Sequence, residues 1–111
     1  MTDKIVVFST CGSAEEARSI GRSLVEAHLA ACVNIIAPVL SIYRWQGAIE
    51  EAAEWLLVIK TRRELTGKVE EELRRVHSYQ VPEILAVQVV DGLRAYLEWI
   101  DSETAVDSST E

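Results

Sequence analysis

Hydrophobic residues form two uninterrupted runs, at residues 5–8 (IVVF) and at residues 55–59 (WLLVI). A strand with one solvated face alternates between apolar and polar positions, so these runs predict strands that are covered on both faces at the centre of a sheet. The second run closes a hairpin over residues 41–61, in which one strand ends at Trp45 and Gly47 supplies a positive φ in the turn. We expect the rest of the chain to be arranged around this hairpin.

Two further segments carry apolar residues at helical spacing, each opened by a capping box. Ser13 with Glu16 predicts the start of the first helix. Thr61 with Glu64 predicts the start of the second. The predicted inner faces comprise Ala17, Ile20, Gly21, Leu24, Val25 and His28 in the first helix, and Leu65, Val69, Leu73 and Val76 in the second. The outer face of the second helix predicts solvated ion pairs four residues apart, Glu64–Lys68, Glu70–Arg74 and Glu71–Arg75.

The remaining segments complete a ferredoxin-like β-α-β-β-α-β pattern of the α+β class, followed by a short helix. Residues 30–45 predict a long second strand, which must be an edge strand or be bulged because Pro38 cannot donate to the ladder. Residues 84–90 predict the last strand, and Asp91 predicts the cap of the terminal helix. The first and third strands are then central. We expect one domain over residues 1–101 and a disordered acidic tail over residues 102–111.

Composition narrows the location and the partners. The chain has 111 residues and a formal net charge of −7, and its eleven lysines and arginines form no basic cluster, which excludes nucleic acid as the expected partner. No apolar run is long enough to span a membrane, and no signal-peptide pattern precedes the first strand, so a cytoplasmic location is expected. Cys11 and Cys32 belong to no CxxC pair and are expected to be reduced thiols.

Several unusual motifs stand in order along the chain. They are Tyr43-x-Trp45-x-Gly47, Glu54, Lys60–Thr61 and His77-x-Tyr79-x-Val81-Pro82-Glu83, with Ala30–Ala31–Cys32 before them and Tyr96–Leu97-x-Trp99 after them. Together they resemble the CutA family of divalent-cation tolerance proteins over about residues 5–100. The resemblance implies a ferredoxin-like subunit in a tight homotrimer to which binding of copper or other divalent metal ions is attributed. Ser78 stands where the commonest form of the motif has proline.

Polar and aromatic residues gather at the ends of the predicted elements, where they are poor material for a core. We expect them to line a ligand cleft between subunits formed by Tyr43, Trp45, Glu54, Lys60, His77, Tyr79 and Glu83. A buried Lys60 would need Glu54 or Glu83 as its counter-charge. Tyrosine and tryptophan suit small-ligand pockets and protein interfaces alike, so the same cluster could instead only hold the trimer together.

The metal-ligand inventory is sparse. Two cysteines, two histidines and one methionine, with no HxH, CxxC or HExxH spacing, argue against a closed four-ligand site within one subunit. No cofactor is required by the sequence, and a copper site would be open, weak or shared between subunits. His77 and Cys32 are the first candidates for ligands. The alternatives are that Cys32 is a small buried apolar group and that His77 caps a helix.

Three functions follow. The leading hypothesis, which the resemblance implies, is a cytoplasmic homotrimer that binds copper or related divalent ions and acts in the response to metal. It is expected to be non-enzymatic because no nucleophile–base–acid spacing stands out. The second is a signalling trimer that resembles the PII proteins and holds a small ligand in clefts between subunits. The third is a purely structural trimer. Self-association is expected because two central strands are apolar on both faces while this fold has helices on only one.

Overall fold

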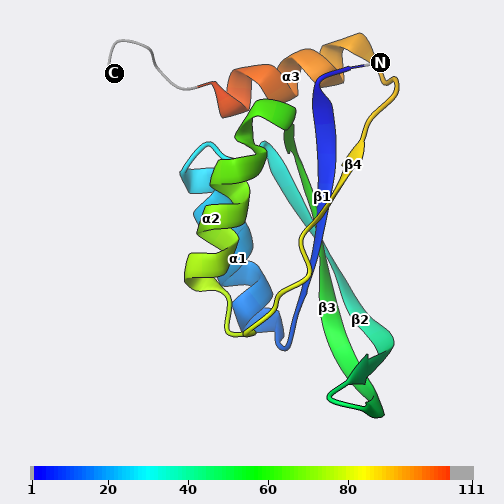
Figure 1. Ribbon diagram of the computed structural model, residues 1–111. Helices are drawn as coiled ribbons and strands as arrows, with labels where there is room; N and C mark the ends of the chain where they lie inside the picture. The colour runs from blue at the N-terminus through cyan, green and yellow to red at the C-terminus, as the bar shows by residue number, and fades with distance from the viewer. Residues whose placement is uncertain (1, 106–111) are drawn as a thin grey trace.

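A computed structural model describes residues 2–105 of the chain. Its elements follow the predicted order (Figure 1). They are β1 (Lys4–Cys11), α1 (Ala14–Glu26), β2 (Cys32–Trp45), β3 (Ala48–Arg62), a 3₁₀ turn (Arg63–Leu65), α2 (Thr66–Val76), β4 (Leu85–Gln88) and α3 (Arg94–Thr104). No helix within residues 2–105 is long and apolar enough to cross a membrane.

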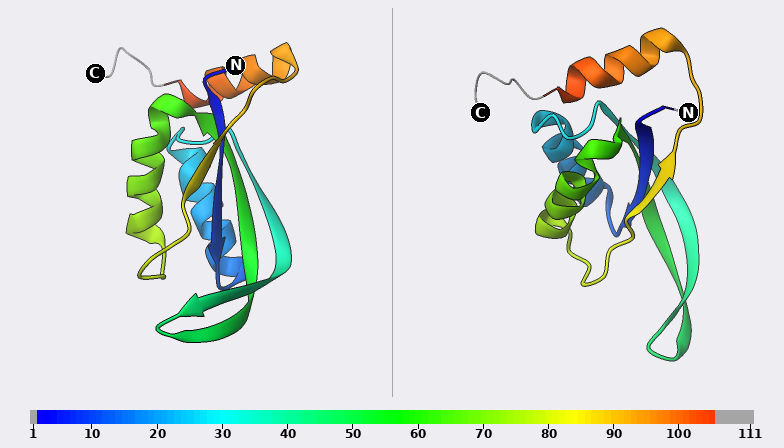
Figure 2. Two further views of the ribbon diagram at one scale, coloured as in Figure 1. Left: turned by 45° about the vertical axis from the view of Figure 1, so that its right-hand side comes forward. Right: turned by 45° about the horizontal axis from the view of Figure 1, so that its top comes forward.

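The four strands form one antiparallel sheet in the order β2-β3-β1-β4. The two strands predicted to be central, β1 and β3, are central, with Val7 paired to Ile59. Helices α1 and α2 cover one face of the sheet, and α3 lies across its end (Figures 1 and 2). The ferredoxin-like prediction is therefore confirmed.

Pro38 acts as expected on an edge strand. Strand β2 has a partner only in β3, and its register shifts between Ile36 and Val39, around the cis Ala37–Pro38 bond. The missing N–H of proline therefore leaves no gap in a regular ladder.

The core lies between the sheet and the two helices. Its fully buried members from the sheet include Val7, Leu57 and Ile59, which meet the inner faces of α1 and α2. At Gly21 an added Cβ would lie 3.4 Å from Cγ1 of Val33, so the glycine in α1 permits the close approach to the sheet that the sequence indicated.

The end of α1 differs from the prediction. The helix ends at Glu26, and His28 leaves it with a φ of 59° in the left-handed region. His28 is exposed, with Nδ1 3.0 Å from the carbonyl oxygen of Glu103, and Val25 is 41% exposed. The prediction that both residues face the core was wrong. For His28 the reason is that helical spacing was extended past the end of the helix, whereas Val25 lies in the last turn of α1 and is only partly covered.

The start of the second helix was also predicted wrongly. Thr61 is fully buried within β3, where its hydroxyl donates to the carbonyl of Leu29 at 2.7 Å instead of capping a helix. The chain then passes through the 3₁₀ turn, and α2 begins at Thr66.

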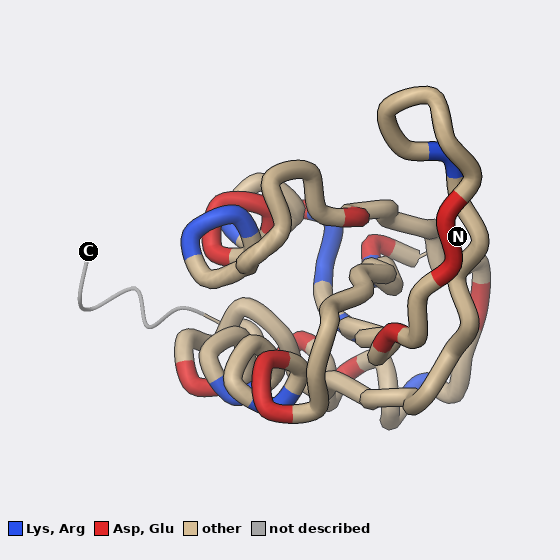
Figure 3. Tube along the Cα trace, turned by 90° about the horizontal axis from the view of Figure 1, so that it is seen from below, with Lys and Arg blue, Asp and Glu red and all other residues tan. Residues whose placement is uncertain are grey.

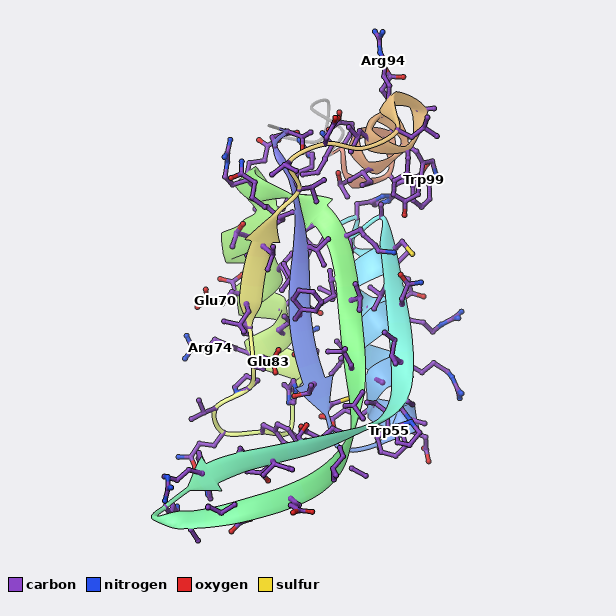
Figure 4. All side chains as sticks on the ribbon, turned by 90° about the vertical axis from the view of Figure 1, so that its right-hand side faces the viewer. Trp55, Glu70, Arg74, Glu83, Arg94 and Trp99 are labelled. Carbon is purple, nitrogen blue, oxygen red and sulfur yellow. The ribbon has the colours of Figure 1, made fainter. Side chains whose placement is uncertain are left out.

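None of the three ion pairs predicted on this helix forms within residues 2–105. Glu64 pairs instead with Arg62, and Arg75 pairs with Glu72 at 2.6 Å. Glu70 and Arg74 lie on the outer side of α2, where each is exposed to solvent (Figure 4). The prediction of a solvated charged face is therefore confirmed, but the predicted ion pairs do not form within residues 2–105. An ion pair between long exposed side chains adds little stability, so no particular partner is strongly favoured.

The C-terminal segment is more ordered than the predicted boundary at residue 101 implies. Asp91 accepts a bond only from the N–H of Gly92, and α3 begins at Arg94 with no side-chain cap. The helix runs to Thr104, a buried residue that bonds to Arg62, and thus enters the segment expected to be a tail. Asp101 in α3 also pairs with Lys4 of β1 at 3.1 Å. Residues 106–111 of the predicted tail lie outside the described residues.

The hairpin extends well past the sheet. The last pair between β1 and β3 joins Cys11 to Trp55, so residues 39–54, the hairpin arm, project beyond β1 (Figures 1 and 2). Its two-residue turn has positive φ at both Gln46 (51°) and Gly47 (84°), which is the type I′ geometry that matches the twist of paired strands.

We predict opposite effects for two glycine substitutions. Gly47→Ala should lower the free energy of unfolding by about 1 kcal/mol, because an L side chain is strained at positive φ. Gly67→Ala in α2, where an added Cβ meets nothing within 4 Å, should raise it by up to about 1 kcal/mol through helix propensity. Guanidinium denaturation measures both, and equal effects of the two substitutions would contradict the assigned turn.

Candidate functional site

A cleft of about 740 Å³ lies between the hairpin arm and the loop that follows α2. The loop, residues 77–83, forms one wall, and in Figure 4 Glu83 lies beside β1 on the side of the hairpin arm. The lining residues are Thr10, Ser41, Ile42, Tyr43, Trp45, Glu50, Glu54, Tyr79, Gln80, Val81, Pro82 and Glu83. One chain thus builds this cleft by itself, and the sequence prediction that a cleft lies between subunits stays a prediction.

Strand alternation places the polar and aromatic side chains of the arm on one face. Ser41, Tyr43 and Trp45 stand at every second position of β2 and all line the cleft. On β3 the same face carries Glu54 and Glu50, the latter directly opposite Tyr43.

His77 fixes the 77–83 loop to the body of the protein. Its Nε2 lies 2.7 Å from the carbonyl oxygen of Thr10, and its Nδ1 lies 3.0 Å from the amide nitrogen of Tyr79. Because a carbonyl oxygen only accepts and an amide N–H only donates, Nε2 carries the proton and Nδ1 accepts. The side chain is fully buried, so the imidazole joins the end of β1 to the start of the loop.

Glu16 holds the same loop from α1. Its carboxylate accepts from the N–H of Ser78 at 2.8 Å and from the N–H of Gly12 at 3.4 Å, while its own N–H donates to the hydroxyl of Ser13 at 3.1 Å. Burial disfavours the charged form, but the donated bonds from Ser78 and Gly12 outweigh it and hold the pKa of Glu16 below its usual value. The predicted cap at Ser13 is confirmed, and its glutamate also orders the loop.

Tyr79 and Glu54 join the two walls of the cleft. The phenol of Tyr79 donates to Oε2 of Glu54 at 2.8 Å, and Glu54 is only 7% exposed. Burial, and then the neighbouring carboxylate of Glu54, raise the pKa of the Tyr79 phenol well above its usual value. The bond connects the loop to the base of the hairpin arm.

The cleft is acidic. Of residues 2–105, which the structure describes, Glu50, Glu54 and Glu83 line it, and no lysine, arginine or histidine does. Seen from below, the hairpin carries acidic segments and one basic segment near its tip, and acidic and basic segments are also mixed on the helices (Figure 3). A concave surface with charge of one sign raises the local concentration of the opposite ion, so this cleft attracts cations.

The structure brings together five of the seven residues predicted to line a cleft. Those five are Tyr43, Trp45, Glu54, Tyr79 and Glu83. His77 lies behind the wall and anchors it. Lys60 is outside the cleft, about 20 Å along β3 from Glu54, and its ammonium bonds to the side chain of Asn34. Within the described residues of one chain Lys60 therefore pairs with neither Glu54 nor Glu83, and positions six residues apart on one strand, such as Glu54 and Lys60, lie far from each other.

The two predicted metal ligands do not converge within one chain. Cys32 pairs with Lys60 in the sheet, while Thr10, which binds His77, pairs with Leu56, about 13 Å further along β3. Both ring nitrogens of His77 already hold hydrogen bonds. Among residues 2–105 no group of three or more histidine, cysteine, aspartate or glutamate side chains could hold a metal ion. These donors therefore do not fit a metal site in a single subunit.

The sequence interpretation missed several lining residues, among them Thr10, Ser41, Glu50 and Gln80. Two of them could have been found, since Ser41 shares the alternation of Tyr43 and Trp45, and Glu50 shares that of Glu54. Thr10 and Gln80 come to the cleft through tertiary packing alone.

Comparisons with known proteins agree over nearly the whole chain. The family model described as "CutA1 divalent ion tolerance protein" matches residues 5–103. The divalent-cation tolerance protein CutA of Thermus thermophilus is 46% identical over 99 residues, 89% of this chain and 96% of that protein. The chloroplastic protein CutA of Arabidopsis thaliana is 39% identical over 100 residues, 90% of this chain but only 55% of that longer protein.

Solved structures share the fold. The crystal structure of CutA from Xylella fastidiosa has a TM-score of 0.92 and 42% identity, and the match covers 94% of this chain and all of that chain (100%). The structure described as the periplasmic divalent cation tolerance protein CutA of Archaeoglobus fulgidus has a TM-score of 0.90 and 40% identity, covering 92% of this chain and 99% of that chain.

We predict that Tyr79 is responsible for a tyrosine titration at unusually high pH. The folded-state pKa is raised, so the Tyr79–Glu54 bond contributes its full stability below the ordinary phenol pKa and loses it as the pH rises through the folded-state value. Tyr79→Phe should abolish the late step in tyrosinate absorbance and lower the free energy of unfolding at neutral pH by about 1 kcal/mol. Tyr96→Phe, the control, should leave that step in place, and its loss there would assign the step to the wrong residue.

Proposed function

The chain belongs to the CutA1 divalent ion tolerance family, and from this premise we propose that it acts in divalent-cation tolerance as a homotrimer that binds copper or related divalent ions, without catalysing a reaction. The observation that carries the proposal is the acidic cleft, which offers carboxylate oxygens and no competing cation. Its other support is the open face of the sheet, which a lone chain leaves uncovered.

The open face is the side of the sheet opposite α1 and α2. Direct pairing puts Phe8, Val58 and Leu85 on one side of the sheet, with Leu85 60% exposed. Val6 and Val87 are a second such pair, and Val87 is 50% exposed. An apolar sheet face bounded by a short edge strand favours burial against another copy of the chain.

The outer side of the hairpin arm adds to this surface. Leu40 and Ile49 are 67% and 68% exposed, and they lie on the face of the arm opposite Tyr43 and Glu50. An arm that is apolar on its outer side and projects beyond its own sheet favours contact with a neighbouring subunit. The choice of three copies comes from the resemblance to the CutA family.

A divalent ion in this cleft would bind weakly and at an open site. Glu50, Glu54 and Glu83 do not converge, so one chain supplies one or two carboxylates, and water or a neighbouring subunit completes the ligand set. Oxygen ligands accept Cu(II) and harder divalent ions, whereas Cu(I) would need the thiol of Cys32, which is half-buried on the sheet. We therefore expect a fold that does not depend on metal and needs no resident cofactor.

The PII-like alternative, a small organic ligand in the cleft, is favoured by one specific observation. Tyr43, Trp45 and Tyr79 line the cleft, and aromatic walls with a few polar groups are typical of small-ligand sites.

The cytoplasmic location stays a prediction, because one relative is named chloroplastic and one is titled periplasmic.

We predict that Val87→Asp dissociates the trimer. A carboxylate on the open face would be buried without a partner in the assembly, while in a single chain Val87 lies half-exposed on the edge strand. Light scattering should give the mass of one chain for this variant and three times that mass for the wild type. Val25→Asp, in α1 on the covered side of the sheet (Figure 2) and 41% exposed, is the matched control and should stay trimeric. A trimeric Val87→Asp variant would contradict the assigned interface.

We predict that copper binding depends on the cleft carboxylates. In calorimetric titration of metal-stripped protein with Cu(II), the double variant Glu50→Gln/Glu54→Gln should bind about tenfold more weakly, a change of ~1.4 kcal/mol. Glu70→Gln/Glu71→Gln on the outer face of α2 removes the same charge and should bind as the wild type does. Chelation should leave the melting temperature nearly unchanged. If Cys32→Ala/His77→Ala abolishes binding and the glutamine variants do not, the ligands belong to those two residues.

A further inference from the structure

We propose that the cleft between the hairpin arm and the 77–83 loop binds linear polyamines, organic cations whose ammonium groups are joined by short methylene chains. This inference rests on the proposed function only in using the same cleft, for which it names a second class of ligand. It follows from the spacing of the cleft carboxylates, from the aromatic rings beside them and from the lack of basic residues among the described residues of the lining.

The carboxylates of the cleft are spread out. Glu50 and Glu54 lie on one face of β3, four residues and so about 13 Å apart, and Glu83 comes from the opposite wall. Their side chains form no cluster that could hold one metal ion. A compact ion can therefore meet only part of this charge, whereas an extended chain with several ammonium groups can meet all of it.

Aromatic rings lie beside these charges. Tyr43 is the direct cross-strand neighbour of Glu50, and the phenol of Tyr79 binds Glu54. Trp45 adds a third ring to the lining of the cleft. Ammonium groups bind the faces of such rings, and methylene chains pack on them, so acids next to aromatic rings match the composition of a polyamine.

Glu54 supplies an independent reason to expect a cationic ligand. Its residue is only 7% exposed, and one carboxylate oxygen accepts the Tyr79 hydroxyl, yet it forms no ion pair with any residue between 2 and 105. A buried carboxylate without a counter-charge is costly. An ammonium group from the cleft would supply that charge.

The same lining excludes anionic ligands. In the part of the chain that the structure describes, no lysine, arginine or histidine lines the cleft, and Arg44, which stands between Tyr43 and Trp45 in β2, is not among the lining residues. Nucleotides and inorganic phosphate would meet three carboxylates and no cation. A PII-like ligand of this protein is therefore positively charged.

Calorimetric titration of the metal-stripped full chain at low ionic strength tests the proposal, with spermine, spermidine, putrescine and butylamine as probes. Affinity should rise with the number of ammonium groups, and spermidine should bind at least about tenfold more tightly than butylamine and lose affinity with added salt. Glu50→Gln and Tyr43→Leu should each weaken spermidine binding about threefold. Glu54→Gln, whose folding is checked by circular dichroism, should weaken it about tenfold.

Controls separate this proposal from a general attraction to acidic protein. Glu70→Gln/Glu71→Gln should bind spermidine as the wild type does, and equal weakening in that variant would overturn the cleft as the site. Equal affinity for butylamine and spermidine, or no spermidine binding at millimolar concentration, would also overturn it. Copper binding without polyamine binding would overturn this inference alone, whereas polyamine binding without copper binding would overturn the proposed metal role and support the inference.

Discussion

The structure depends on the unequal covering of one sheet. Strands β1 and β3 are apolar on both faces, but α1 and α2 cover only the face that carries Val7 and Ile59. The helices cover the core on that side, whereas Val58 and Val87 lie on the opposite side and leave apolar surface there in contact with water. Burial of apolar area is the main favourable contribution to association, so the property that stabilises the subunit also favours its assembly.

The same sheet explains why the candidate site lies at one end of the molecule. Strands β2 and β3 extend beyond the end of β1. The hairpin arm therefore has no third strand beside it among the described residues and carries side chains on both faces. The cleft exists because the 77–83 loop is fixed opposite one of these faces by His77 on Thr10 and by Glu16 on Ser78. His77 thus contributes to the cleft through two hydrogen bonds, to Thr10 and to Tyr79, that fix the 77–83 loop as one of its walls.

Charge decides which chemistry the cleft favours. Its carboxylates and aromatic rings without a basic residue select cations, and their spacing selects between kinds of cation. A metal ion needs ligands that converge within a few ångströms, whereas a flexible polycation needs charges in a row. Both proposed kinds of ligand are consistent with membership of a divalent-cation tolerance family, and each proposal uses Glu50 and Glu54 in a different way.

The sequence by itself determined the element order, the central places of β1 and β3, the edge place of β2 at Pro38 and five of the twelve cleft residues, because these follow from local periodicity and backbone chemistry. Only the tertiary structure decided the roles of Thr61, His77 and Lys60. Each is a polar residue near the end of an element, and its role depends on which distant group lies within hydrogen-bond distance: Leu29 for Thr61, Thr10 for His77 and Asn34 for Lys60. Such partners are set by packing between segments remote in sequence, and no local pattern encodes them.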